Sequence, residues 1–569
     1  MLSTNSLLAA IVAVTSLVAL NPAGKMDSLT QARMLDASGS SRVIVRAADG
    51  TSATSLLSAV TDLGGTVLGA LPLVNATLVE LPNRSLVTLA LHPAVERISY
   101  DRLLLGAMER TGATVRATEV REDFGYDGAG VGVAIIDSGV TSWHDDLASA
   151  GGPQRVHQFV DFVNGHARAY DDYGHGTHVA GIVAGNGFDS TGKRTGIAPG
   201  AHLIVMKVLD AAGRGRISDV IAALDYVVAH RGTLDIRIVN MSIATGVYES
   251  YDTDPLTLAA KRAVEAGIVV VAAAGNRGRN PDGHDVYGGV TAPGNAPWVL
   301  TVGASSHMGS TRRDDDTMAV FSSRGPSAVD HGAKPDVVAP GVGLESLSDP
   351  ESAFYTTKAK YLLNGTVSTS YLPYLSLSGT SMASPVVSGT VALMLQANPA
   401  LTPNQVKAIL QYTAQVYADY DPLTQGAGFV NARGAVRLAR HFAAPSSTYP
   451  STSGWSRRVI WGNRLMKGDR LSAGASAWAM DATWGASRNA SGARVTTGLT
   501  STINVVWGSA CGGADCDGPW TVEGTSDEDS VVWGTDDADS VVWGTDDGDS
   551  VVWGTTCSDP ACEPVVWEP

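Results

Sequence analysis

The chain has 569 residues, of which 44% are hydrophobic and 17% charged, so it is long enough for two or three domains and too apolar for a disordered protein. Its formal net charge of −16 is concentrated at one end, because residues 501–569 hold 15 of the 56 acidic residues and none of the 40 basic ones. The rest of the chain is nearly neutral, so its charge excludes nucleic acid and anionic membranes as implied partners.

The chain begins with an apolar run, from about residue 7 to residue 20, that is short for a membrane-spanning helix of roughly 20 residues. We expect residues 1–24 to be a secretory signal, although they lack a positively charged start and a clear small-residue cleavage motif. A signal anchor or a buried helix is the alternative. All four cysteines lie beyond residue 510, which suits an oxidising exterior and a secreted or cell-surface protein.

Two segments with different hydrophobic periods follow. Residues 42–101 alternate period-two apolar stretches with helix-like ones, which predicts a small α+β unit. In residues 112–440, apolar β-branched runs such as "VGVAIID" (131–137) and "GIVVVAAAGN" (267–276) alternate with helical stretches. Runs of this kind are typical of strands buried on both faces, so we expect an α/β domain of three layers with a parallel sheet between helices.

A change in composition predicts a boundary near the end of the second segment. Ten of the 12 tryptophans lie at or beyond Trp455, and the preceding residues are rich in Ser, Thr and Pro. We expect residues 443–457 to be a linker and residues 458–569 to be a separate Trp-rich, acidic extension.

Three motifs of the α/β segment carry candidate catalytic residues. Asp137 ends an apolar strand in "AIIDSGV", His175 precedes a small-residue helix in "GHGTHVAG", and Ser381 begins another helix in "GTSMASP". A serine at a helix start meets unpaired N–H groups and the positive end of the helix dipole, which favour developing negative charge. Each residue alone also fits a helix cap or a turn, and His178 competes with His175 for the role of a base.

The order Asp, His, Ser differs from that of the α/β-hydrolases, and together with further segments it resembles the subtilisin-like serine peptidases. The similar segments include "GIAPGAHLIVMKVLDAAGRG" (196–215), "FSSRGPS" (321–327) and "KPDVVAPG" (334–341). The resemblance implies that Ser381 is the nucleophile, His175 the general base and Asp137 the group that orients the imidazole. It also implies that Asn276 of "AAAGN" stabilises the oxyanion.

The resemblance implies further sites around the catalytic residues. Substrate is expected to bind as an added strand along backbone groups of Ser242, Ile243, Ala244, Ala273, Ala274 and Gly275. Ala244 replaces the usual glycine of the family, so its methyl group would narrow a side-chain pocket. No cofactor is needed for the chemistry, but Asp146 matches a calcium ligand of the family, although the loop "GNGFDSTGKRTG" (185–196) does not look like the calcium-binding version.

Residues 42–101 resemble the propeptide of these peptidases, which assists folding and inhibits the enzyme until it is removed. We therefore expect a secreted endopeptidase that processes itself, with a cut between about residues 101 and 112, and with its own propeptide and protein or peptide substrates as partners. A permanent N-terminal subdomain is the alternative for residues 42–101. For the whole chain, the alternative is a catalytically idle protein that binds a surface or polymer through its Trp-rich tail.

The tail contains three near-identical copies of "SVVWGT" between residues 530 and 555. Each copy reads as a short strand and a turn, but three copies are few for a self-supporting stack, so a disordered tail is an equal alternative. The flanking cysteines Cys511, Cys516, Cys557 and Cys562 are expected to form two local loops rather than a zinc site. We expect the tail to contact a cell surface or export machinery, and residues 455–569 to be dispensable for hydrolysis.

Overall fold

A computed structural model describes residues 22–506, apart from short segments at 36–37, 102, 107–113, 150–151, 281–282, 309–312, 314–315, 446–447 and 501–502. The expected signal segment up to residue 21, the repeats at 530–555 and the four cysteines lie outside the described residues. The chain divides into two compact units, Met1–Asp101 and Arg102–Pro569. Among the described residues, none of the helices is both long and apolar enough to cross a membrane.

The first unit is an antiparallel sheet covered by helices, in the strand order β2-β3-β1-β4. Its chain order βαββαβ is ferredoxin-like, which agrees with the small α+β unit that the sequence predicts. The elements are β1 (Ser40–Ala47), α3 (Leu57–Asp62), β2 (Thr66–Leu71), β3 (Ala76–Pro82), α4 (Leu86–Ala90) and β4 (Val95–Tyr100). The unit begins earlier than residue 42, because α2 (Ser28–Leu35) contacts β4 and Met26 is buried in the same core.

The second unit contains an eight-stranded sheet in the order β14-β13-β12-β10-β6-β8-β7, with β15 also paired to β13. All its strand pairs are parallel except β13 with β14. Strands β6 and β12 are buried along their whole length, as expected for apolar runs covered on both faces. The strands are β6 (Gly132–Asp137), β7 (Val156–Asp161), β8 (His202–Lys207), β10 (Ile236–Met241), β12 (Val269–Ala273), β13 (Leu300–Ser306), β14 (Thr317–Met318) and β15 (Val337–Pro340).

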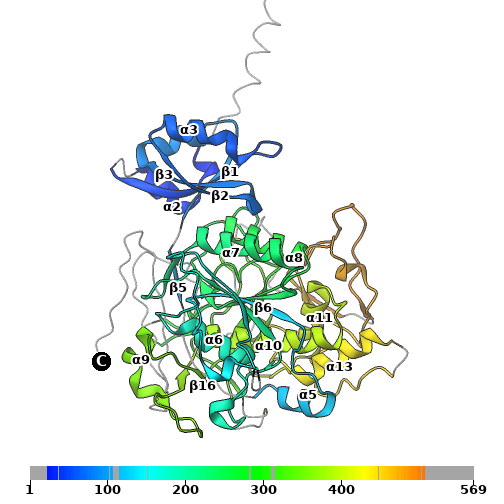
Figure 1. The fold of residues 1–569 in the computed structure, drawn as a ribbon. Helices are drawn as coiled ribbons and strands as arrows, with labels where there is room; N and C mark the ends of the chain where they lie inside the picture. Colours follow the sequence, from blue (N-terminus) through cyan, green and yellow to red (C-terminus); the bar gives the residue numbers. More distant parts are fainter. Residues whose placement is uncertain are drawn as a thin grey trace, which may run out of the picture. The chain divides into compact units, whose positions relative to one another are not determined.

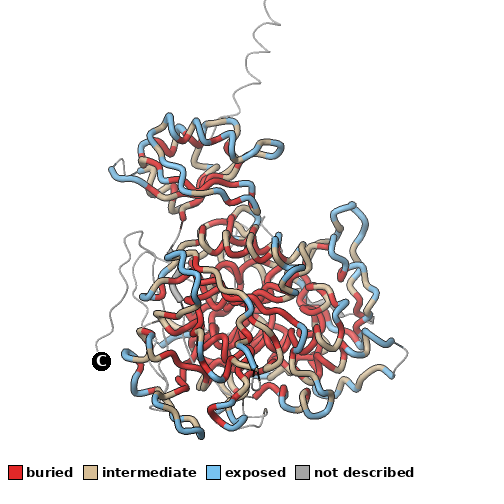
Figure 2. Tube along the Cα trace, viewed as in Figure 1, coloured by how far each residue is buried: buried red, intermediate tan, exposed pale blue. Residues whose placement is uncertain are grey.

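Helices cover both faces of this sheet, which confirms the expected three layers (Figure 1). α7 (Ile217–His230) and α8 (Pro255–Glu265) pack on each other and on one face. α6 (His175–Ala184) and α10 (Thr380–Ala397) lie together on the other face. α10 runs through the middle of the buried core, which Figure 2 shows as the dense red interior of the unit.

The segment after residue 454 packs against the α/β domain rather than standing apart from it. Trp455, Trp461, Trp478 and Trp484 belong to the same hydrophobic core as the main sheet. Three short strands form a small antiparallel sheet, β19 (Arg458–Trp461), β20 (Arg464–Lys467) and β23 (Ile503–Val506).

Hydrogen bonds join this segment to α11 (Pro403–Thr413). The Asn404 amide donates to the carbonyls of Ala477 and Ala482 at 2.9 and 2.8 Å, and the Tyr412 hydroxyl donates to the Asp469 carbonyl at 2.6 Å. Residues 455–500 therefore form part of the folded unit.

Candidate active site

Asp137 and His175 meet at the carboxyl end of the central sheet. Asp137 is the last residue of β6, and His175 is the first residue of α6. Both side chains are fully buried, and His175 Nδ1 lies 2.7 Å from Asp137 Oδ1. Asp137 Oδ1 also accepts the Ser138 N–H at 2.7 Å, so the carboxylate is held in place while it orients the imidazole.

A second carboxylate, which is not among the residues expected from the sequence, fixes the start of α6. Asp171 accepts the N–H groups of Gly174 and Thr177 at 2.8 and 2.7 Å, and the Ser138 hydroxyl at 2.8 Å. Gly174 has a φ of 103°, a conformation that disfavours side chains. A Cβ atom there would also lie 2.6 Å from Ser352 Oγ. The glycine before the histidine is thus required by both the turn and the packing.

Ser381 is the second residue of α10 and is fully buried. Pro385 lies four residues further on and has no N–H, so the Ser381 carbonyl cannot make its usual helical hydrogen bond. The Ser242 hydroxyl donates to that carbonyl at 2.6 Å instead. Ser242 in turn accepts a hydrogen bond from the Asn240 amide at 2.9 Å. Because Pro385 cannot bond this carbonyl, Ser381 is instead hydrogen-bonded to the segment that follows β10.

The reacting atoms of the histidine and the serine are buried and make no hydrogen bond to other described atoms. This holds for His175 Nε2 and Ser381 Oγ. The helices that carry them, α6 and α10, pack on each other. Catalytic hydrogen bonds are often long before substrate binds and tighten in the reacting complex.

Asn276 lies three residues after β12 and is 5% exposed. Its Oδ1 accepts the backbone N–H and the hydroxyl of Thr380 at 3.0 and 2.9 Å. Thr380 precedes Ser381, so the amide is fixed with its oxygen toward the start of α10. Gly275, with a φ of 100°, donates its N–H to the same Thr380 hydroxyl at 3.1 Å.

A short strand of the same unit lies between two edge strands beside Ser242. β5 (Leu103–Gly106) pairs antiparallel with β11 (Ile243–Ala244) on one side and with β9 (Arg214–Arg216) on the other. Ile243 and Ala244 are among the residues expected to pair with substrate, whereas the residues of β9 were not expected near the site. The glycines of "GRGR" (213–216) are the only signal in the sequence that could have indicated a second strand partner.

The expectation that backbone groups of Ala273 to Gly275 pair with substrate needs correction. The Ala274 N–H donates to the Val302 carbonyl at 2.9 Å, and its carbonyl accepts the Thr291 N–H at 3.0 Å. The Gly275 carbonyl accepts the Ser323 N–H at 2.9 Å. These backbone groups are already hydrogen-bonded to other parts of the domain. The segment can therefore form a wall of the site, but it has no free strand edge with which a substrate strand could pair.

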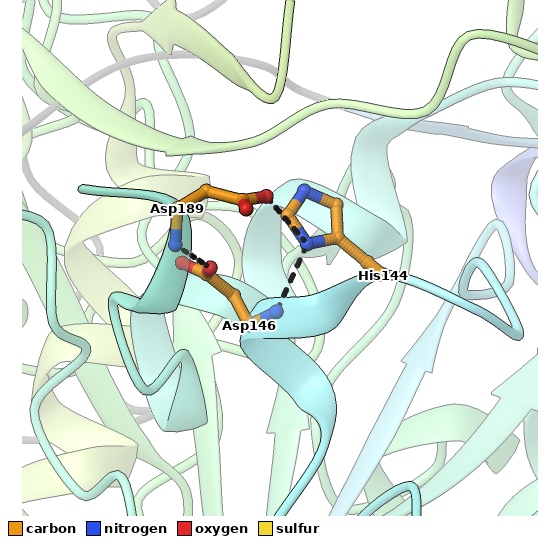
Figure 3. Close-up of side chains that lie close together, drawn as sticks. All are labelled: His144, Asp146 and Asp189. Carbon is orange, nitrogen blue, oxygen red and sulfur yellow. Dashed lines mark hydrogen bonds and ion pairs between the residues drawn. The ribbon is translucent and has the colours of Figure 1, made fainter. Parts of the chain in front are cut away.

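Asp146 lies in a buried cluster with His144 and Asp189 (Figure 3). Asp146 Oδ1 accepts the Asp189 N–H at 2.9 Å, and Oδ2 accepts the Tyr374 hydroxyl at 2.8 Å. Burial raises the pKa of Asp189, and the charge of Asp146 acts in the same direction. Calcium prefers six to eight oxygen ligands, whereas this cluster offers two carboxylates and an imidazole, so the residues do not fit a calcium site.

A segment that was not expected to be near the site, residues 349–372, also lies against the loop that leads into α6. This segment includes α9 (Ala353–Thr357). The centroids of the Phe354 and Tyr173 rings lie 4.4 Å apart. Asp349 opens this segment and is 3% exposed. Burial raises the pKa of the Asp349 carboxyl to about 7, and the charge of Asp171 adds to this.

The parallel sheet, the Asp–His contact and the serine at a helix start define a serine peptidase of the subtilisin type. The comparison of the sequence with protein families leads to the same class. The Subtilase family matches residues 128–443, which is more than half of the chain, and the chain belongs to this family. It is a serine endopeptidase, whose chemistry needs no cofactor.

Individual relatives agree with this assignment. The chain is 38% identical over 348 residues to the serine protease AprX of Bacillus subtilis, covering 60% of this chain and 74% of that protein. It is 31% identical over 363 residues to a thermostable alkaline protease of Halalkalibacterium halodurans, covering 64% and 82%. The fold is similar to that of fervidolysin from Fervidobacterium pennivorans, with a TM-score of 0.53, 22% identity and coverage of 70% of this chain and 61% of the other.

Proposed function

We propose that this endopeptidase cleaves peptide bonds with Ser381 as nucleophile, His175 as general base and Asp137 as the group that orients the imidazole. The observation that carries this proposal is the 2.7 Å contact between His175 Nδ1 and Asp137 Oδ1, since it directs the opposite nitrogen, Nε2, away from the carboxylate. That nitrogen is then available to take the proton from Ser381 Oγ.

The reaction follows from these positions. Ser381 Oγ attacks the substrate carbonyl while His175 Nε2 accepts its proton, and the Ser381 N–H with the Asn276 amide stabilises the resulting oxyanion. The imidazolium gives the proton to the leaving amine, which leaves an acyl group on Ser381. Water, deprotonated by the same imidazole, then attacks the acyl group and releases the carboxylic acid and free serine.

We also propose that the chain is a zymogen that cuts itself just after β5. Leu105 of β5 is opposite Ala244, and Gly106 is opposite Ile243. β5 therefore runs alongside β11 toward Ser242, whose hydroxyl binds the carbonyl of Ser381. A chain that follows the path of β5 as substrate would therefore present to Ser381 a peptide bond between residues 106 and 112. The unit Met1–Asp101 is the proposed propeptide.

Mutation of the proposed nucleophile tests both roles. The wild-type chain should lose its N-terminal unit and show a new N-terminus within residues 107–112 by mass spectrometry. Ser381→Ala should keep the full-length mass, whereas Thr390→Val, further along the same helix, should still be trimmed, because the Thr390 hydroxyl donates to the Val386 carbonyl within that helix. Equal trimming of Ser381→Ala in a preparation free of other proteases would rule out self-processing.

The remaining proposals concern location. We propose that residues 1–24 direct secretion and that the Trp-rich tail contacts a cell surface or export machinery, because the acidic repeats stand beyond the catalytic segments and carry no candidate catalytic set. Protein or peptide chains are the substrates. A catalytically idle binding protein is disfavoured, since such a protein has no need of Asp137, His175, Asn276 and Ser381 together.

A further inference from the structure

A fully buried lysine lies on the strand next to the one that ends at Asp137. Lys207 is the last residue of β8, and the parallel pairing of β6 with β8 places it opposite Asp137. Its side chain is 0% exposed, and no step of the proposed reaction uses it. Lysine is almost never buried so completely unless its charge is paired, so its partners explain its position.

The Lys207 ammonium donates one hydrogen bond to each of three segments. Nζ lies 2.7 Å from the carbonyl oxygen of Ser138, 2.6 Å from Asp172 Oδ1 and 2.7 Å from the carbonyl oxygen of Leu209. The centroid of the Tyr170 ring lies 4.9 Å from the same atom, which adds a cation–π contact. All three ammonium protons thus have an acceptor.

Ser138 connects Lys207 to both members of the catalytic pair. The Ser138 N–H donates to Asp137 Oδ1 at 2.7 Å, and the Ser138 hydroxyl accepts the Gly176 N–H at 2.9 Å. Gly176 directly follows His175 in the first turn of α6. Movement of Ser138 would therefore change the position of the carboxylate and of the helix that carries the imidazole.

Asp172 connects Lys207 to the chain that leads into α6. It lies three residues before His175, and its side chain is 32% exposed, whereas the ammonium that it binds is fully buried. The ion pair therefore joins the end of β8 to the loop that positions the proposed base. The third acceptor, Leu209, begins the connection from β8 to β9, the strand that pairs with β5.

Lysine has the donor geometry that this position requires. Three N–H groups diverge from one atom, whereas an Asn or Gln amide offers two and the donors of arginine lie in one plane. Burial of the ammonium costs free energy, which the carboxylate of Asp172, the two carbonyls and the Tyr170 ring offset. The side chain therefore holds three segments at one point rather than forming a single ion pair.

We propose that Lys207 is a positioning residue, which holds the segments that carry Asp137 and His175 at the separation required by their 2.7 Å contact. It acts through Ser138 and Asp172, and its hydrogen bonds do not go to either catalytic side chain. The inference rests on the proposed function, because it assigns Lys207 a role in the same site. It differs from a purely structural role, which would change the amount of folded enzyme but not the turnover of each folded molecule.

Asp172→Ala is the most suitable variant, because it removes only the link between Lys207 and the loop before His175. Asp172 is partly exposed, so water can take the place of the deleted carboxylate, and we expect the chain to fold. Lys207→Met, by contrast, would leave three acceptors without their donor. Asp172→Asn is the conservative variant, since its amide oxygen can still accept from the ammonium.

Turnover is measured for each active site. Every processed chain is titrated with a fluorophosphonate, which labels activated serines, and is assayed on a chromogenic peptide. If a variant does not trim itself, a trace of tagged wild-type enzyme removes the N-terminal unit and is then withdrawn by its tag. For Asp172→Ala we expect kcat per labelled site to fall by about ten- to a hundredfold, since small misplacements of reacting groups have effects of this size. KM should stay within about twofold, because the contact of Lys207 with Leu209, which leads to β9, remains.

Two further variants serve as comparisons. Asp172→Asn should recover most of the kcat that is lost in Asp172→Ala. Glu265→Ala should keep the wild-type kcat, although it also breaks a short ion pair of a partly exposed carboxylate, at 2.7 Å from Arg262. That pair lies within α8, on the face of the sheet opposite to α6 and α10.

Three results would overturn the proposal. The first is a wild-type kcat per labelled site in Asp172→Ala, with a loss only in Tm or in the labelled fraction. The second is an equal fall in kcat in Asp172→Ala and Asp172→Asn. The third is a rise in KM at an unchanged kcat, which would place the effect in substrate binding. A processed wild-type chain that takes no label would instead refute the proposed function itself, and this inference with it.

Discussion

Single hydrogen bonds across long stretches of sequence hold the proposed nucleophile in place. The Ser242 hydroxyl reaches the Ser381 carbonyl across 139 residues of chain. This contact exists because Pro385 removes the N–H that would otherwise bond the same carbonyl in an α-helix. Because of this proline, the position of the first turns of α10 depends on a hydrogen bond from Ser242, which follows β10.

This arrangement predicts a rescue. Ser242→Ala leaves the buried Ser381 carbonyl with only the longer hydrogen bond, of 3.4 Å, from the Ser384 hydroxyl, so we expect the free energy of unfolding to fall by about 1–3 kcal/mol. Adding Pro385→Ala supplies a backbone N–H and should recover part of the loss. Chemical denaturation of both variants in the Ser381→Ala background measures this. A double variant with the summed losses of two independent sites would contradict the account.

At the level of elements, the segment 349–372 lies against the loop that leads into α6. The Ala353 N–H donates to the Asp172 carbonyl, and the Phe354 N–H donates to the Tyr173 carbonyl, at 2.9 and 3.1 Å. These residues immediately precede His175. Residues 349–372 therefore support the position of the proposed base, although they contribute no strand to the main sheet.

The buried carboxyl of Asp349 gives this region a pH dependence. Its folded pKa of about 7 lies above the ordinary value of 3.8, so the folded state binds the proton more tightly than the unfolded state. Stability should therefore fall as pH rises from about 4 to about 7, by a few kcal/mol at most, since one pKa unit corresponds to about 1.4 kcal/mol. Thermal melts across this range should be flatter for Asp349→Asn. Glu351→Gln, an exposed neighbour whose charge is the smallest of the contributions to the Asp349 pKa, should keep most of the wild-type slope, and an unchanged slope in Asp349→Asn would refute this origin.

For the whole molecule, the boundary of the folded unit differs from the boundary in composition. Truncation after residue 506 removes only residues outside the described part of the chain, so we expect unchanged Tm and peptide hydrolysis. Truncation after residue 454 removes Trp455, Trp461, Trp478 and Trp484 from the core and leaves α11 exposed. We expect this shorter chain to lose several kcal/mol of stability or fail to fold. Equal melting temperatures for the two truncations would show that residues 455–506 are an independent appendage.

The sequence was sufficient to predict those features that depend on local patterns. Asp137 follows a run of buried strand residues, and His175 and Ser381 follow glycines at helix starts, so their positions at the ends of elements could be predicted. The prediction that the three residues act together required the family resemblance, because the spacing of the three motifs carries no information on distance.

Features that depend on contacts between distant segments were not predictable. In the sequence, Asp171 cannot be distinguished from other acidic residues in loops. Its role is evident only from its hydrogen bonds to the N–H groups of Gly174 and Thr177. The pairing of β9 with β5 and the packing of residues 455–500 on α11 likewise result from tertiary contacts rather than from periodicity. The enrichment in tryptophan indicated a separate tail. In the structure, four of these tryptophans, between residues 455 and 484, are buried in the core of the α/β domain, which explains the enrichment in that part of the chain.

The most direct test of the central claim is labelling with a fluorophosphonate probe, which reacts with serines activated by a neighbouring base. The wild-type protein should incorporate one label, and peptide mapping should assign it to Ser381. Ser381→Ala should not be labelled, and His175→Ala should be labelled far more slowly, because the base that accepts the proton is missing. A folded and processed wild-type protein that takes no label, or a label that persists in Ser381→Ala, would contradict the proposed mechanism.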